Sequence, residues 1–348
     1  MSNGADLVYV LSDLLHGQLA SIEILPGGLQ EWADIEMPPN IEPPSPKFPF
    51  VLVEGNLGIP KKILYVLYTA AVHLPWQSSE SQVAIAASAI VVLLNPAHQT
   101  ALNTRKRLIR NGHLAAEKEL QFTELISRGS PECGKQSMIW DHRRWCFQQI
   151  YGVMGTARET PYLKQWASSE EMRIFPRMSP AAISHELNIV YHTCETYPRN
   201  YHAWSHWHFV VNVCYASMHL SEDHATKRDF FGVIVNEYSR LQEWVDCHVS
   251  DYSAMHQLCQ TQNLLRHLEN TRSYENDGGT NLASTPLADH AFTLVTAYPS
   301  HESLWLYLRV SLADLSPERR SVVLERLKIE CPISENRLAQ QLLVRYSR

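Results

Sequence analysis

The residues most able to do chemistry are histidines, cysteines and arginines. His202 and His206 have the i, i+4 spacing that places two metal ligands on one helical face. No Glu lies between them and no third ligand is in view, so we interpret them as a structural pair and expect no metal bound by this chain. The seven cysteines are scattered and include no Cys-x-x-Cys pair, so they predict buried free thiols and no zinc site.

Two arginines, Arg105 and Arg143, each follow a large apolar residue by three positions. They could face a substrate or a partner subunit. In stacks of helical hairpins, however, such arginines commonly bridge neighbouring hairpins through carboxylates and backbone carbonyls. We favour the bridging role.

The elements that must position these residues follow from a signature that recurs five times. It is clearest as Tyr-Pro-Arg-Asn-Tyr-His-Ala-Trp at Tyr197–Trp204, and in outline it is a Pro, a large apolar anchor six residues later, and polar residues in the next turn. The anchors lie 38 to 64 residues apart, which suits a two-helix unit with variable loops. The anchors are Leu102, Trp140, Trp204, Met255 and Trp305.

The motif also predicts where the helices start. Asn95 and Pro96 resemble an N-cap followed by a proline at the first helical position. The anchor should then lie nearly two turns inside its helix, wedged between its own hairpin and the next. The motifs are expected near residues 93–110, 131–148, 197–214, 249–266 and 298–313.

The rest of the chain is predicted to be helices and loops, with no alternating pattern that indicates a strand. Helices are expected at Ala5–Ala20, Pro60–His73, Ser78–Leu94, Pro317–Lys328 and Ser334–Arg345. Loops are expected at Met37–Pro49, which holds six prolines, and at Gly152–Pro180 and Glu275–Thr285. We therefore divide the chain into residues 1–59, an N-terminal helix with a Pro-rich extension, and residues 60–348, an α-solenoid of antiparallel helical hairpins.

Composition limits the function. With 45% hydrophobic and 19% charged residues the chain can bury a core, and its net charge of −6 with no dense Lys/Arg cluster argues against nucleic acid. The longest apolar run, Val83–Leu94, is too short to cross a bilayer, so no direct membrane insertion is expected. No charged-then-apolar leader opens the sequence, and the expected location is cytoplasmic.

The motifs Trp140-Asp-His-Arg-Arg-Trp145 and Asn200-Tyr-His-Ala-Trp204-Ser-His206 resemble the repeat of protein prenyltransferase α subunits. Within that family, the stretches Val51–Gly58 and Leu93–Pro96 most resemble α subunits of type III geranylgeranyltransferase. The resemblance implies an all-α fold, a right-handed superhelical α-solenoid that wraps around a separate β subunit.

By resemblance, the β subunit would hold zinc and the isoprenoid, and this chain would bind no cofactor itself. Zinc would activate a cysteine thiolate of a protein substrate, which attacks geranylgeranyl diphosphate. The same resemblance assigns Lys135, in the second repeat, to stabilising the diphosphate. It places Asn200, Tyr201 and His202 of the third repeat toward substrate and diphosphate, with Arg143 as a further candidate.

Departures from the family pattern keep a second hypothesis open. Trp207, Leu258 and Leu308 stand where the family has arginine. The chain could therefore be a helical-repeat adaptor that kept the stack and lost the reaction. The presence of Asn200, Tyr201 and His202 favours the enzyme subunit, because hairpin packing needs only Ala203 and Trp204 of that segment.

Overall fold

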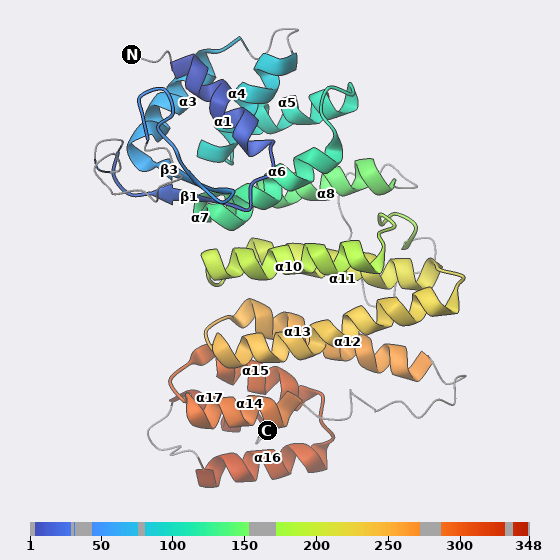
Figure 1. Ribbon diagram of the computed structural model, residues 1–348. Coiled ribbons are helices and arrows are strands. Elements are labelled where there is room, and N and C mark those ends of the chain that lie inside the picture. Colours follow the sequence, from blue (N-terminus) through green and yellow to red (C-terminus); the bar gives the residue numbers. More distant parts are fainter. Residues whose placement is uncertain are drawn as a thin grey trace. The chain divides into compact units, whose positions relative to one another are not determined.

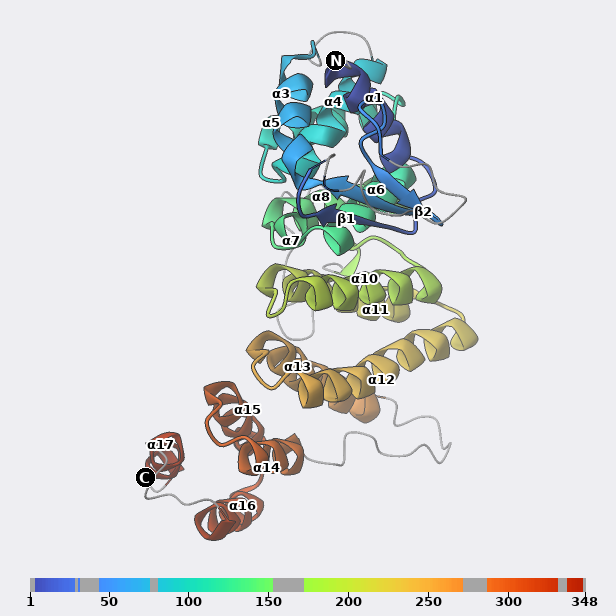
Figure 2. The ribbon, with the colours of Figure 1, turned by 60° about the vertical axis from the view of Figure 1, so that its left-hand side comes forward.

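The computed structural model describes residues 4–28, 31, 44–75, 81–152, 172–271, 287–330 and 337–346. These residues are mainly helical, as predicted, and form two compact units, residues 1–220 and 221–348. Figures 1 and 2 show the helices of each unit arranged in successive pairs. The loop predicted at Glu275–Thr285 and most of the loop predicted at Gly152–Pro180 lie outside the described residues.

The first unit contains three helical hairpins. In each, two helices pack against each other, and the second helix carries an anchor. The pairs are α4 (Ser81–Leu94) with α5 (Gln99–Arg110), α6 (Ala116–Gly129) with α8 (Ser137–Tyr151), and α10 (Pro180–Thr196) with α11 (Tyr201–Leu220). The short helix α7 (Pro131–Gly134) connects α6 to α8.

The second unit repeats this arrangement with two further hairpins. They are α12 (His224–Cys247) with α13 (Tyr252–Thr271), and α14 (Leu287–Ala297) with α15 (Glu302–Ala313). The final helices α16 (Pro317–Glu330) and α17 (Arg337–Tyr346) pack on α14 and α15, close to their predicted ranges.

The expectation that the chain has no strand is wrong. A three-stranded sheet joins β1 (Ser21–Leu25), β3 (Asn56–Pro60) and β2 (Val51–Val53) in that order, with β1 parallel and β2 antiparallel to β3. Glu54 and Gly55 connect β2 to β3 with φ of 50° and 81°. Positive φ at both central residues is typical of the type I′ hairpin turn. Asn-Gly or Asp-Gly would have predicted this turn from the sequence, but the chain has Glu-Gly here, which is not a recognised signal for it.

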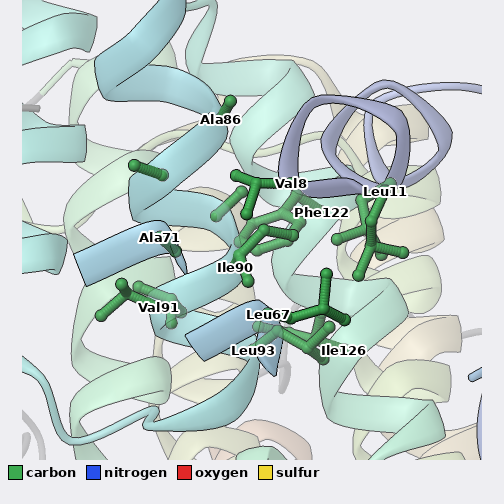
Figure 3. Packing of buried hydrophobic residues seen from close by; sticks show 14 of the residues in the cluster. Val8, Leu11, Leu67, Ala71, Ala86, Ile90, Val91, Leu93, Phe122 and Ile126 are labelled. Atoms are coloured by element: carbon green, nitrogen blue, oxygen red, sulfur yellow. The ribbon is translucent and has the colours of Figure 1, made fainter. Parts of the chain in front are cut away.

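Residues of the predicted N-terminal extension contribute to the core of the first unit. Helix α1 (Gly4–Leu15) packs on α3 (Leu64–His73) and α4, with a 3-10 turn, η1 (Lys61–Ile63), just before α3. Figure 3 shows Val8 and Leu11 of α1 among Ile90, Leu67 and Phe122. Helix α4 is apolar around most of its circumference, and such a helix is stable only when neighbours surround it.

The predicted helix starts need correction. Pro96 lies in a turn, and α5 begins at Gln99 with His98 as its N-cap. In all five hairpins the second helix begins three residues before its anchor, so each anchor is the fourth helical residue, one turn inside rather than two. The proline directs the chain through the turn between helices and does not start the second helix.

Candidate functional site at the junctions between hairpins

The anchors are all buried, which places the polar residues around them at the contacts between hairpins. Two of the indoles also satisfy their N–H groups in the preceding turn. Trp140 Nε1 donates to the carbonyl oxygen of Gly134 at 2.8 Å, and Trp305 Nε1 donates to that of Pro299 at 2.8 Å. The exposed fractions are 3% for Leu102, 1% for Trp140, 0% for Trp204, 2% for Met255 and 4% for Trp305.

Three of the anchor helices begin with a side-chain cap. His98, Asn200 and Asp251 each stand four residues before an anchor, and each accepts a hydrogen bond from the backbone N–H three residues further on, at 3.1 to 3.2 Å. This arrangement satisfies one of the N–H groups that every helix leaves unpaired at its start. Four residues before an anchor is therefore the capping position of the repeat.

Asn200 does not face a substrate, contrary to the expectation. It is 1% exposed, its Oδ1 caps α11, and its Nδ2 donates to the carbonyl oxygen of Gly134 at 2.8 Å. Gly134 has no room for a side chain, because a Cβ there would lie 2.7 Å from Thr193 and 2.9 Å from the Ser127 carbonyl. Asn200 therefore attaches the start of α11 to the turn before α8.

That attachment brings Lys135, the residue after Gly134, close to the start of α11. Lys135 follows α7 and its Nζ lies 2.6 Å from Glu132 Oε2, with 34% of the lysine side chain exposed. The hydrogen bond to Glu132 raises the pKa of Lys135. The lysine is therefore a cation at neutral pH at an accessible position.

Tyr201 and His202 are the first two residues of α11, and they remain accessible. Tyr201 is 58% exposed and His202 is partly exposed. Their ring centroids lie 5.5 Å apart at an angle of 74°. Of the four residues assigned by resemblance in this region, Lys135, Tyr201 and His202 thus present side chains to solvent and Asn200 does not.

Arg143 is buried and serves the junction, as the bridging interpretation holds. Its Nε and a terminal nitrogen contact the two oxygens of Glu186 at 2.9 and 2.5 Å, and it also donates to Thr123 Oγ1 and the Leu120 carbonyl. At 1% exposure it offers no accessible surface to a diphosphate. The assignment of Arg143 to substrate binding is therefore not supported.

Arg105 makes the same kind of contact one hairpin earlier. It forms a bidentate pair with Glu119 at 2.8 and 2.5 Å, and His142 Nε2 lies 2.7 Å from the same carboxylate. Around Glu186 the third member is His206, whose Nε2 lies 2.7 Å from Oε1. Each of these Arg–Glu–His clusters takes an arginine three residues after one anchor and a histidine two residues after the next.

Sequence reasoning missed both glutamates. Each lies on the first helix of its hairpin, Glu119 on α6 and Glu186 on α10, and they follow their arginines by 14 and 43 residues. The sequence carries only a weak signal for them, namely a glutamate at a fixed distance before the polar residue that follows an anchor by two positions. Glu186 precedes His206 by 20 residues, and Glu237 precedes Gln257 by the same 20 residues. Glu237 and Gln257 are buried in the second unit.

The buried clusters shift the pKa values of their members. Burial alone would raise the pKa of Glu186, but Arg143 and His206 lower it to about 2. Burial lowers the pKa of His206 to about 4, against the raising effect of Glu186. Arg144 Nε lies 3.4 Å from His206 Nδ1, so the ring is neutral, with Nε2–H donating to Glu186. These carboxylates and imidazoles hold the hairpins together.

The cysteines and histidines show no arrangement of metal ligands in the described part of the chain. No group of three or more His, Cys, Asp or Glu residues there is placed to hold a metal ion. Cys133 is buried and lies 3.4 Å from the Leu93 carbonyl, and burial raises the pKa of its thiol to about 12. Among the described helices, none has the length and apolar character needed to cross a membrane.

The comparisons agree with this geometry. The family description "Protein prenyltransferase alpha subunit repeat" matches residues 183–214, which cover most of the hairpin of α10 and α11. A zebrafish (Danio rerio) protein named "Protein prenyltransferase alpha subunit repeat-containing protein 1" is 28% identical over 294 residues, covering 75% of this chain and 63% of the relative.

Two further relatives carry similar names. The Xenopus laevis protein named "Protein prenyltransferase alpha subunit repeat-containing protein 1-A" is 31% identical over 219 residues, covering 60% of this chain and 45% of the relative. The Homo sapiens protein is 30% identical over 217 residues, covering 60% and 48%. The chain thus spans about half to 63% of the length of these relatives. With its helical hairpins and recurring anchors, the chain contains a prenyltransferase alpha subunit repeat at residues 183–214 and is similar to proteins named for that repeat.

Proposed function

We propose that this chain is the α-type subunit of a heterodimeric protein prenyltransferase that transfers a geranylgeranyl group to a cysteine of a protein substrate. The observation that carries the proposal is the hydrogen bond from Asn200 to the Gly134 carbonyl. It holds Lys135 beside the start of α11, where Tyr201 and His202 are accessible. The partner would be a β subunit that supplies the isoprenoid pocket.

The chemistry of the transfer explains why these residue types are suitable. A thiolate forms a bond to the first carbon of geranylgeranyl diphosphate while the carbon–oxygen bond to diphosphate breaks and both bonding electrons leave with the oxygen. Zinc in the β subunit would keep the thiol deprotonated. Positive charge and hydrogen-bond donors near the departing oxygens then stabilise the transition state. Lys135 supplies the charge, and Tyr201 and His202 supply donors.

The ion pair with Glu132 does not prevent this role. Glu132 is 69% exposed and Lys135 is 34% exposed, and ion pairs between such exposed groups contribute about 0 to 1 kcal/mol. A diphosphate, which carries more charge than one carboxylate, would displace Glu132 at small cost. The lysine is then held near its working position before the substrate arrives.

Co-expression with a geranylgeranyltransferase β subunit tests the proposal. The complex should form 1:1 and transfer labelled geranylgeranyl to a protein, and neither subunit should do so alone. Lys135→Ala should lower the single-turnover rate by about a hundredfold, the usual effect of losing one such group, with complex formation and thermal unfolding unchanged. Lys118→Ala, which removes an exposed lysine from α6, is the matched control and should leave the rate unchanged.

The adaptor hypothesis has an observation in its favour as well. The Arg–Glu–His cluster occurs at two junctions of the first unit, whereas Trp207, Leu258 and Leu308 replace the arginine at later anchors. A helical stack that has lost part of the family's polar pattern can bind partners without transferring a lipid. A chain that stays monomeric beside the β subunit, or a complex whose rate does not depend on Lys135, would favour the adaptor.

A further inference from the structure

A cationic and aromatic patch lies where α5 and α8 carry Lys106, Arg110 and Trp145. The ammonium nitrogen of Lys106 lies 5.4 Å from the ring centroid of Trp145, and the guanidinium carbon of Arg110 lies 5.3 Å from it. Arg110 is exposed, and Lys106 and Trp145 are partly exposed. We call these three residues the Trp145 patch.

The positive charge of the patch is not neutralised within the described part of the chain. Lys106 and Arg110 are one helical turn apart, where like charges repel, and neither forms an ion pair with a described carboxylate. Asp141 lies on the same side of α8, but it is bound to Arg144 at 3.3 Å. Burial lowers the pKa of Lys106, and the charge of Arg110 lowers it further, against the raising effect of Asp141.

The indole of Trp145 packs against a second ring of the same helix. The ring of His142 stacks against that of Trp145, with centroids 5.9 Å apart and an interplanar angle of 18°. His142 is itself fixed by Glu119 within the buried cluster. The indole N–H of Trp145 makes no hydrogen bond to a described residue, so it can donate to a ligand, as indoles only donate.

We propose that the Trp145 patch binds an acidic segment of a protein partner, with carboxylates on Lys106 and Arg110 and an apolar side chain against the indole. The two cations can form charge-assisted hydrogen bonds with two or three carboxylates, and the indole can pack against one apolar side chain. A nucleic acid would need a longer positive track, and the net charge of −6 opposes one. The proposal does not depend on prenyl transfer.

Fluorescence anisotropy of a labelled peptide tests the proposal. The probe is a fluorescein-labelled decapeptide of nine glutamates with one central leucine, titrated with the full chain at low and at physiological salt. We expect binding that weakens as salt increases. The double variant Lys106→Gln/Arg110→Gln should bind at least tenfold more weakly, and Trp145→Ala should also lose affinity.

Arg107→Gln is the matched control, because Arg107 is exposed on the same helix and, unlike Lys106 and Arg110, does not lie over the ring of Trp145. It removes one positive charge and should change affinity less than twofold. Equal losses from Arg107→Gln and from the double variant would mean nonspecific attraction and would overturn the proposal. Absence of binding, or tighter binding of an oligouridylate through the same residues, would also overturn it. Thermal unfolding of each variant verifies that the fold is intact.

Discussion

The side-chain amide of Asn200 donates to the carbonyl oxygen of Gly134 at 2.8 Å, and Trp140 donates its indole N–H to that same oxygen at 2.8 Å. One backbone carbonyl thus joins the anchor of the second repeat to the cap of the third. Because Lys135 follows Gly134 directly, the geometry that packs the hairpins also places the candidate catalytic cation.

The capping role of Asn200 predicts a loss of stability in Asn200→Ala. The variant removes an N-cap, worth about 1 kcal/mol, and a buried hydrogen bond, worth about another 1 kcal/mol. Urea unfolding should therefore show a loss of about 2 kcal/mol. Tyr201→Ala is the control, since its side chain is 58% exposed and surface changes usually stay within about 0.5 kcal/mol. Equal effects of the two variants would contradict the capping role.

The Arg143–Glu186 pair predicts strong coupling between the two residues. Glu186→Leu leaves a buried guanidinium unpaired and should cost about 3 to 5 kcal/mol, whereas Arg143→Met/Glu186→Leu should cost less than either single change. A double-mutant cycle on the free energy of unfolding measures the coupling.

The exposed pair Arg326–Glu330 of α16, with side chains 48% and 45% exposed, is the comparison. Its cycle should give below about 1 kcal/mol. If the two cycles gave similar energies, Glu186 would not hold the junction.

His206 predicts how stability depends on pH. Its folded pKa, about 4, lies below the ordinary value of 6.5, so the unfolded chain binds the proton first as pH falls. The contribution of the neutral ring is complete above pH 6.5 and is lost as pH falls toward 4. Glu186, whose pKa is lowered from 4.5 to about 2, adds a second loss below pH 4.5.

The measurement is the thermal unfolding midpoint between pH 7 and pH 3. His206→Gln should be less stable at pH 7 and should show a smaller decline between pH 6.5 and 4, with the decline below pH 4.5 retained. The pKa of His142 is also lowered, so part of the decline in stability between pH 6.5 and 4 should remain in this variant. An unchanged slope in the variant would show that folding does not lower the pKa of His206.

Gly129 predicts a steric effect at the sheet. A Cβ there would lie 2.2 Å from the Ile22 carbonyl oxygen, so Gly129→Ala must displace β1 from the end of α6 and should cost about 1 to 3 kcal/mol. Gly232→Ala in α12 meets no atom within 4 Å and should stabilise its helix by about 0.5 to 1 kcal/mol. Differential scanning calorimetry of both variants tests these opposite signs, and a neutral Gly129→Ala would mean that β1 does not pack there.

The sequence by itself determined the helical fold and the positions of the anchors, because both depend on local patterns. Apolar periodicity indicates helices, and the recurring large residues such as Trp140 and Trp204 can be recognised one repeat at a time. The resemblance also indicated the region of the candidate site, since Lys135 and Tyr201 stand at fixed places in their motifs.

Tertiary structure decided which polar residues are accessible and which hold the hairpins together. Arg143 and Glu186 are 43 residues apart in the chain, so no local pattern could join them, and their burial settles that the arginine bridges hairpins. Asn200 and Tyr201 are neighbours in the motif, yet one is buried and the other exposed. Likewise β1 pairs in parallel with β3 across more than thirty residues, a contact that only the folded chain can make.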